Sequence, residues 1–116
     1  QRGGLGCVQE FEMLVDDVAV TYRGERHFFA PPGFAGGGAG GLAQAVIHRS
    51  NGAVERIPSK IVTRLMKGDR LVIVTAGGAG YGSPAERSRE QIAEDLANGK
   101  ITADGARRAY PQAALL

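Results

Sequence analysis

The chain opens with two segments in which hydrophobic and polar residues alternate, which is the pattern of half-buried β-strands. Both lie within residues 7–29. Residues 10–13 place two apolar side chains on one face and two glutamates on the other, and residues 18–23 alternate in a similar way. Asp16 and Asp17 lie between the segments and favour a turn, because short carboxylate side chains accept hydrogen bonds from nearby backbone amides.

A second pair of strands is predicted on either side of an Asn-Gly dipeptide. Residues 45–49 lead into Ser50, Asn51 and Gly52, and residues 54–57 are the expected return strand. Asn-Gly is a strong hairpin signal because a type I′ turn requires positive φ at both central positions. We therefore expect a type I′ hairpin here.

Residues 61–66 and 71–75 predict a further hairpin, joined through residues 67–70. Residues 71–74 are apolar at every position, which is typical of a strand that is covered on both faces. We expect this strand to be the most buried one in the chain.

Two glycine-rich stretches interrupt the strands. The chain contains 18 glycines among 116 residues, about twice the usual share of ~7%. Residues 31–41 begin with two prolines, which exclude a helix and a central strand, and their glycines bring no side chains to a core. Residues 77–82 form the second stretch. Both stretches are predicted to be loops.

From residue 83 onward the signals are helical. Ser88 and Gln91 have the spacing of a capping box at the start of a helix. Asn98 and Gly99 are expected to close this helix in the left-handed conformation. Thr102 then caps a short second helix, which Pro111 ends.

The first helix of this tail has a narrow apolar face. Ile92 and Leu96 stack one turn apart, and Glu94 and Asp95 are expected to stay outside. Helices this short are marginal in water unless such a face is packed. We expect the tail to dock on a surface, and residues 71–74 are the best candidate within the chain because only a short glycine loop separates them.

These elements together predict an α+β fold of predominantly antiparallel β-strands with Gly-rich loops, followed by two short C-terminal helices. Residues 1–82 are the expected β-rich region, and residues 83–116 are the helical tail of the same domain. No internal repeat and no heptad pattern is present.

Charge and composition narrow the class of protein. The 14 basic and 12 acidic residues give a net charge of +2, and the basic residues are scattered without interleaved aromatic residues, so no nucleic-acid partner is expected. No apolar run approaches the ~18 residues of a membrane span, and no signal peptide is recognisable. Cys7 is the only cysteine, which fits a reducing compartment. We therefore expect a cytoplasmic protein without a membrane partner.

The glycine stretches are the first candidates for chemistry. Candidates for a cofactor contact are the loop residues Gly36, Gly37, Gly40, Gly78 and Gly80. The first stretch satisfies the G-x-G-x-x-G spacing of a dinucleotide site, but prolines precede it where that site has a strand. Glycines required for tight turning are the favoured interpretation.

Metal and catalytic sites find less support. The two histidines, His27 and His48, lie far apart, and the sequence has no metal-ligand spacing, so no metal site is expected. His27 is interpreted as a packed or edge-exposed residue. Cys7 lies in an apolar segment and is expected to be a small buried hydrophobe. No self-contained set of catalytic residues can be identified, and catalytic groups are expected outside this chain.

Several short segments, taken in chain order, resemble the C-terminal region of hydantoinase B/oxoprolinase proteins. The segments that carry the resemblance are Arg2-Gly3-Gly4-Leu5-Gly6, Arg26, Pro31-Pro32-Gly33, Gly36-Gly37, Gly40, Pro58-Ser59-Lys60, Lys67-Gly68-Asp69, Gly77 to Pro84, Glu86-Arg87, Asp95, Asn98-Gly99, Ala106-Arg107 and Tyr110. The sequence departs from the family pattern at Ala79, Ser83 and Pro111, and the last departure leaves the extreme C-terminus unassigned.

The resemblance implies a subunit that works with a hydantoinase A-type partner and uses ATP, with a divalent metal in the complete enzyme. Such enzymes open a small cyclic amide after phosphorylation has made an unreactive carbonyl reactive. This chain would be the mainly structural C-terminal segment, inactive alone and packed on the upstream part of its own subunit. It is expected to bind neither ATP nor metal by itself.

Two alternatives stay open. Related complexes carboxylate ketones, and this chain could be the corresponding segment of such a carboxylase. A freestanding β-rich module that binds a ligand or a partner is a different class. The encoding reading frame distinguishes a larger enzyme from the freestanding module. Several hundred residues before Gln1 favour the enzyme, and a start codon there favours the module. The chain opens without methionine, as if cut from a longer protein.

Overall fold

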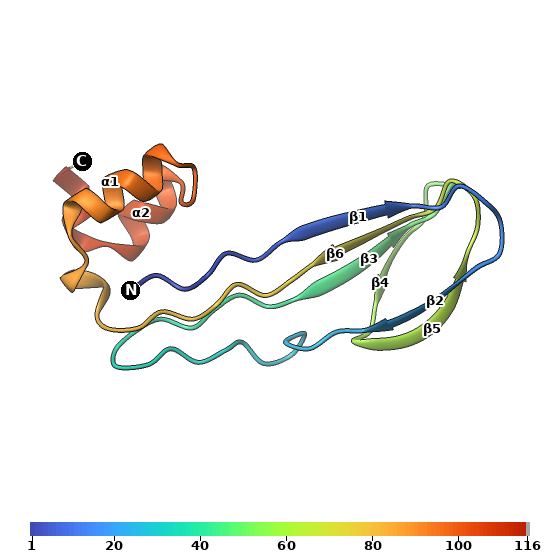
Figure 1. Ribbon diagram of the computed structural model, residues 1–116, viewed down its shortest axis with the longest axis horizontal. Helices are drawn as coiled ribbons and strands as arrows, with labels where there is room; N and C mark the ends of the chain where they lie inside the picture. Colours follow the sequence, from blue (N-terminus) through green and yellow to red (C-terminus); the bar gives the residue numbers. More distant parts are fainter. Residues whose placement is uncertain (116) are drawn as a thin grey trace.

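The computed structural model describes residues 1–115 and forms an elongated molecule of 53 × 26 × 17 Å, with strands at one end and helices at the other (Figure 1). Its elements, in chain order, are β1 (Val8–Glu12), β2 (Val18–Arg23), β3 (Gln44–His48), β4 (Val54–Ile57), β5 (Lys60–Leu65), β6 (Arg70–Val74), η1 (Pro84–Glu86), α1 (Arg89–Ala97), α2 (Ala103–Ala109) and η2 (Pro111–Leu115). The predicted α+β class, with antiparallel strands before two short helices, is confirmed. Within the described part of the chain, the helices are too short and polar to cross a membrane.

The six strands form two antiparallel sheets. One sheet has four strands in the order β1-β6-β3-β4, and the other pairs β2 with β5. The predicted hairpin between residues 61–66 and 71–75 is therefore wrong, although both strands exist. The connection does not reverse the chain within one sheet, because it pairs with Met13: Gly68 donates to the Met13 carbonyl at 2.8 Å, and Met13 donates to the Asp69 carbonyl at 2.9 Å. The chain between β5 and β6 therefore passes from one sheet to the other and is held in this course by Met13.

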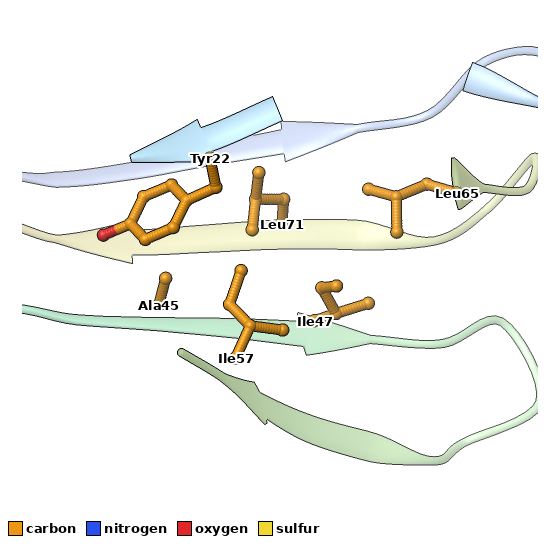
Figure 2. Close-up of a cluster of buried hydrophobic side chains, with 6 residues drawn as sticks. All are labelled: Tyr22, Ala45, Ile47, Ile57, Leu65 and Leu71. Atoms are coloured by element: carbon orange, nitrogen blue, oxygen red, sulfur yellow. The ribbon is translucent and has the colours of Figure 1, made fainter. Parts of the chain in front are cut away.

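The hydrophobic core lies between the two sheets (Figure 2). Its buried side chains come from five strands and are Tyr22, Ala45, Ile47, Ile57, Leu65 and Leu71. Each of the larger ones contributes about 1.5–3 kcal/mol by leaving water. The alternating patterns of β2, β3 and β5 supply this core, because every second side chain of a strand points to the same face.

Strand β6 lies inside the four-stranded sheet, yet it is not the most buried strand. Leu71 is its one buried residue, whereas β3 buries both Ala45 and Ile47 almost completely. Val72 and Val74 are half-buried because, among residues 1–115, no layer covers the outer face of this sheet. The apolar run of residues 71–74 predicted a strand covered on both faces, and the structure covers only the face that carries Leu71.

The hairpin between β3 and β4 is confirmed, but its turn is not of type I′. Gly52 has a φ of +90°, while Asn51 does not have positive φ. The Gly52 amide donates to the Arg49 carbonyl at 2.9 Å, and Asn51 Oδ1 accepts from the Ala53 amide at 3.0 Å. The side chain of Asn51 thus stabilises the loop from an ordinary backbone conformation, and the glycine alone provides the left-handed residue.

The helix caps of the tail are as predicted. Ser88 Oγ accepts from the Gln91 amide at 3.2 Å, and Thr102 Oγ1 accepts from the Gly105 amide at 3.0 Å. Gly99 closes α1 with a φ of +65°. Each cap satisfies a backbone group that the helix itself leaves unpaired.

The two tail helices do not dock on β6, which corrects the expectation for residues 88–110. Instead, its helices pack on one another around a separate cluster of Ile92, Ala106, Tyr110 and Ala113. The reason is the conformation of the 77–82 segment, which is extended. Six extended residues span roughly 20 Å, so this segment carries the helices away from the sheets rather than folding them back (Figure 1).

Candidate functional site

Three glycine-rich segments run side by side between the sheets and the helices, and we call them the glycine-rich neck (Figure 1). They are residues 1–6, 33–41 and 76–82. Residues 76–82 lie in the middle: the Gly78 amide donates to the Gly4 carbonyl and the Gly80 amide donates to the Gly38 carbonyl, both at 2.9 Å. The structure thus joins the two predicted loops and adds the N-terminal segment to them.

Close backbone approach, more than turning, is what requires glycine in the neck. A Cβ atom on Gly37 would lie 2.0 Å from the Gly80 carbonyl oxygen, and one on Gly40 would lie 2.3 Å from that of Gly77. Neither Gly37 nor Gly40 has positive φ; of the five candidate glycines, only Gly36 does, at +89°. The favoured interpretation, tight turning, therefore holds for Gly36, and steric exclusion of a side chain explains Gly37 and Gly40. At Gly78 and Gly80 a Cβ atom would lie 3.0 and 3.3 Å from the nearest backbone atom, which is a tight contact without exclusion.

The amides of the candidate glycines are mostly engaged within the chain. Those of Gly37, Gly40, Gly78 and Gly80 donate to the carbonyls of Phe34, Pro31, Gly4 and Gly38, each at 2.9 Å. A phosphate-binding loop needs amides that point outward at the ligand. The geometry of these four amides therefore does not fit a nucleotide phosphate.

A buried carboxylate ties the neck to the helical tail. Asp95 on α1 is only 4% exposed, and its Oδ2 accepts from Arg2 Nε at 3.1 Å and from an Arg87 Nη at 2.5 Å. Burial by itself would raise the pKa of the Asp95 carboxyl. The hydrogen bonds and charges of Arg2 and Arg87 together outweigh burial and hold this pKa below its usual value. Asp95 is therefore ionised in the folded protein and links residues 93 positions apart.

A cavity of about 220 Å³ lies where the neck meets the tail, lined in part by Arg2, Gly37, Gly80, Arg87 and Tyr110. The Arg87 guanidinium lies 5.9 Å from the centre of the Tyr110 ring, which is within the range of a cation–π contact. The positive side chains that line this cavity are already paired with Asp95. Its lining has no nucleophile beside a base.

A second buried carboxylate, Asp69, organises the far end of the sheets. It accepts from the amides of Ser50 and Met66 and from Arg49, at 2.8, 2.9 and 3.0 Å. These bonds, led by the one from Met66, lower the pKa of Asp69 to about 2. Arg49 also pairs with Glu55 at 2.9 Å. Because every donor is part of a turn or a neighbouring strand, Asp69 has a structural role.

The residues considered for metal or nucleophilic chemistry do not come together. His27 is 9% exposed and shares a hydrogen bond of 2.8 Å with the Tyr22 hydroxyl, so it is packed, which is one of the two expected interpretations. Cys7 is exposed, which corrects the expectation of burial, because the adjoining strand β1 lies at a sheet edge with both faces open. Within residues 1–115, no three His, Cys, Asp or Glu side chains are placed to hold a metal ion.

The sequence interpretation missed the ionic link between neck and tail. It placed Asp95 on the outer surface of α1, and the structure buries it. The expected apolar face of Ile92 and Leu96 did not include Asp95, although Ile92 and Asp95 are the two buried residues of α1. The partners Arg2 and Arg87 come from outside this helix, so its own pattern does not show them. Arg2, Arg87 and Asp95 are all among the residues that carry the resemblance to hydantoinase B/oxoprolinase proteins. That resemblance was the signal in the sequence that could have pointed to this ionic link.

Comparison with known proteins agrees with these features. The family model for hydantoinase B/oxoprolinase matches residues 1–84. A protein of Pseudomonas sp. strain NS671, named as the proposed B-type component of a D-/L-hydantoinase, is 34% identical over 108 residues, which cover 90% of this chain and 18% of that protein. The beta chain of the caprolactamase of Pseudomonas jessenii is 32% identical over 113 residues, covering 94% and 19%.

A more distant match is 5-oxoprolinase of Dictyostelium discoideum, 30% identical over 81 residues, which cover 70% of this chain and 6% of that protein. The chain spans about a fifth of the length of the hydantoinase and caprolactamase relatives. No solved structure matches it. The family match takes in the whole glycine-rich neck and both sheets, and the chain belongs to the hydantoinase B/oxoprolinase family.

Proposed function

We propose that this chain is the C-terminal, mainly structural segment of a subunit in an ATP-dependent enzyme that opens cyclic amides. The names of three relatives carry the proposal: hydantoin, caprolactam and 5-oxoproline are all rings closed by an amide bond. Two of these relatives are named as subunits, which supports a hetero-oligomer with a hydantoinase A-type partner. The cytoplasm, which supplies ATP, is the compartment that we propose for it.

The chemistry of ring opening explains why ATP is used. An amide carbonyl is a poor electrophile, and transfer of the γ-phosphoryl group to its oxygen makes the carbon reactive. Water then adds to that carbon, and the ring C–N bond breaks, which frees the nitrogen group and leaves an acyl phosphate. A second water hydrolyses the acyl phosphate to a carboxylate and inorganic phosphate. We place the reacting groups and the divalent metal in the rest of the enzyme, because residues 1–115 offer no metal cluster and no nucleophile paired with a base.

Within that enzyme the segment has a connecting role. Its neck joins two separately packed ends through backbone contacts that only glycine allows. The Arg2–Asp95–Arg87 cluster then fixes the tail to the neck. This connection supports a function in which the sheets and the helical tail are kept in place as surfaces that bind the upstream part of the subunit or the partner.

The test compares the complete subunit, purified with its A-type partner, with the 116-residue chain alone. We expect the complex to release ADP in step with ring opening of hydantoin, caprolactam or 5-oxoproline, and the chain alone to show no turnover. Turnover by the chain alone would contradict the structural role. Incorporation of labelled bicarbonate into a ketone, without ring opening, would instead assign the carboxylase alternative.

If the chain were a freestanding binding module, it would be encoded with its own start codon and would bind a ligand or partner without the remaining subunit. Sequencing the encoding reading frame upstream of Gln1 distinguishes the two cases. Several hundred preceding codons in frame are the result expected from the length of the relatives.

A further inference from the structure

A cleft of about 400 Å³ opens where β2 ends and β5 begins. Its lining includes Arg26, His27, Phe28 and Phe29 from the loop after β2, and Lys60 at the start of β5. The two parts are more than 30 positions apart and are joined by a hydrogen bond of 2.7 Å from the Gly24 amide to the Ser59 carbonyl. The side chains of Arg26, Phe28, Phe29 and Lys60 belong neither to the core nor to the cavity between neck and tail.

Positive charge is concentrated at this cleft without internal compensation. Arg23 and Lys60 are direct partners across β2 and β5, and both are exposed. Like charges directly opposite on a sheet are destabilising. Among residues 1–115, no carboxylate forms an ion pair with Arg23, Arg26 or Lys60. Of the residues that line the cleft, Arg26 and Lys60 are cations and Glu25 is a carboxylate, which leaves one positive charge in surplus. Arg23, beside the cleft, adds a second.

The backbone holds the cleft in a defined and unfavourable conformation. Arg26 has a φ of +63°, in the left-handed region that is unfavourable for a residue with a side chain. Its carbonyl accepts from the Ala43 amide at 2.9 Å, and the next residue, His27, is buried against Tyr22. A Cβ atom on Gly24 would lie 2.3 Å from the Tyr22 hydroxyl, so the start of this loop is closely packed against Tyr22. The Arg26 side chain is thus presented from a fixed loop.

Apolar surface adjoins the positive charge. The Phe28 and Phe29 side chains line the same cleft and are 71% and 79% exposed. Large aromatic side chains rarely face water together without a partner. A ligand that has both an anionic group and a flat apolar part would neutralise the cations and cover the rings.

We propose that this cleft binds an oxyanion, a phosphate or a carboxylate group, through Arg26 and Lys60, while the apolar part of the ligand packs on Phe28 and Phe29. The planar fork of arginine can donate two parallel hydrogen bonds to either group. Lys60 adds a mobile point charge, and Arg23 strengthens the local positive potential. The site is separate from the proposed structural role of the chain and does not depend on which reaction the complete enzyme performs.

The test is calorimetric titration of the complete subunit at low ionic strength with inorganic phosphate, phenyl phosphate and benzoate. We expect at least one of the two aromatic probes to bind more tightly than inorganic phosphate, because only these reach the phenylalanine rings. Tighter binding of phenyl phosphate assigns a phosphoryl ligand, and tighter binding of benzoate assigns a carboxylate. Absence of binding by all three probes at millimolar concentrations would overturn the proposal.

Two variants separate a binding role from a structural one. Arg26→Gly removes the guanidinium and also relieves the positive φ, so it should weaken aromatic-probe binding by at least about tenfold, the scale of a single lost charge-assisted contact, without lowering the melting temperature. Lys60→Gln changes an exposed side chain and should also weaken binding. Arg56→Gln, an exposed arginine on β4, is the matched control. Equal weakening in the control would overturn the proposal. So would probe binding by the 116-residue chain that is lost in the complete subunit, because the cleft would then be a protein interface.

Discussion

At the sheet end of the molecule, apolar side chains from two sheets fill the space between them, whereas the helical tail is attached through glycine backbone and ion pairs. The core of the sheets is built from large residues such as Ile47 and Leu65, both essentially unexposed. Most residues of the neck are glycines, and at Gly37 and Gly40 a carbonyl oxygen of the facing segment occupies the place that a Cβ atom would need. The core of the sheets can accommodate small changes in side-chain shape, because neighbouring side chains adjust. The glycine-rich neck cannot accommodate an added side chain at its closest contacts, because backbone atoms would have to move.

The largest effect is expected at the sheet end. Ile47→Ala should lower the free energy of unfolding by about 2–5 kcal/mol, because it removes a fully buried side chain and leaves a cavity. Denaturant unfolding measures this change. Val62→Ala is the control. Val62 lies on β5 and is 75% exposed, so this change should alter the free energy of unfolding by less than about 0.5 kcal/mol. Similar losses from both variants would show that the two sheets do not share one packed core.

The ionic link of the tail should come next. Asp95→Ala leaves Arg2 and Arg87 without their partner and should cost about 3 kcal/mol, at the lower end for a buried pair because Arg2 is still partly exposed. Hydrogen exchange is the measurement: amides of α1 and α2 should lose protection while those of β3 keep theirs. Glu94→Ala on the same helix is exposed and should leave exchange unchanged. Loss of protection in β3 as well would mean that the two ends unfold as one unit.

A smaller effect, of about 1–3 kcal/mol, is expected from a single methyl group in the neck. In Gly37→Ala, the added Cβ would lie 2.0 Å from a backbone oxygen, so the segments must separate. The neighbouring Gly38→Ala is the matched control, because nothing lies within 4 Å of a Cβ there. Thermal unfolding of the two variants measures the difference. Equal melting temperatures would show that close backbone approach does not explain the glycines of the neck.

The smallest effect is a dependence of stability on acid pH. The folded-state pKa of Asp69 is lowered to about 2 from an ordinary value of 3.8. A lowered pKa stabilises the fold above the ordinary value, and this stabilisation is lost as the pH falls from about 4 towards about 2. The pKa of Asp95 is lowered in the same direction. Asp69→Asn should therefore flatten the fall of unfolding free energy with pH over this window; an unchanged slope would place the titrating groups elsewhere.

Much of the fold could be predicted because its signals are local. Alternation located β1 and β2, the Asn-Gly turn located β3 and β4, and the apolar segments on either side of residues 67–70 located β5 and β6. Ser88 and Thr102 marked the starts of the helices, and Gly99 marked an end. Strand pairing was not predictable in the same way. Residues 61–66 and 71–75 are adjacent along the chain, but β5 pairs with β2 and β6 with β1 and β3. Which strands pair depends on contacts such as those of Met13 and Asp69, which come from distant positions.

For the candidate site, the sequence by itself determined the positions of the glycines, the separation of strands from helices and the lack of metal-ligand spacing, because each depends on neighbouring residues. Only the tertiary structure decided that Gly37 faces Gly80, that Asp95 is buried between Arg2 and Arg87, and that Arg26 meets Lys60 at one cleft. These features join residues far apart in the chain. Periodicity reports which face of its own element a side chain occupies, and it contains no information on what another segment brings to that face.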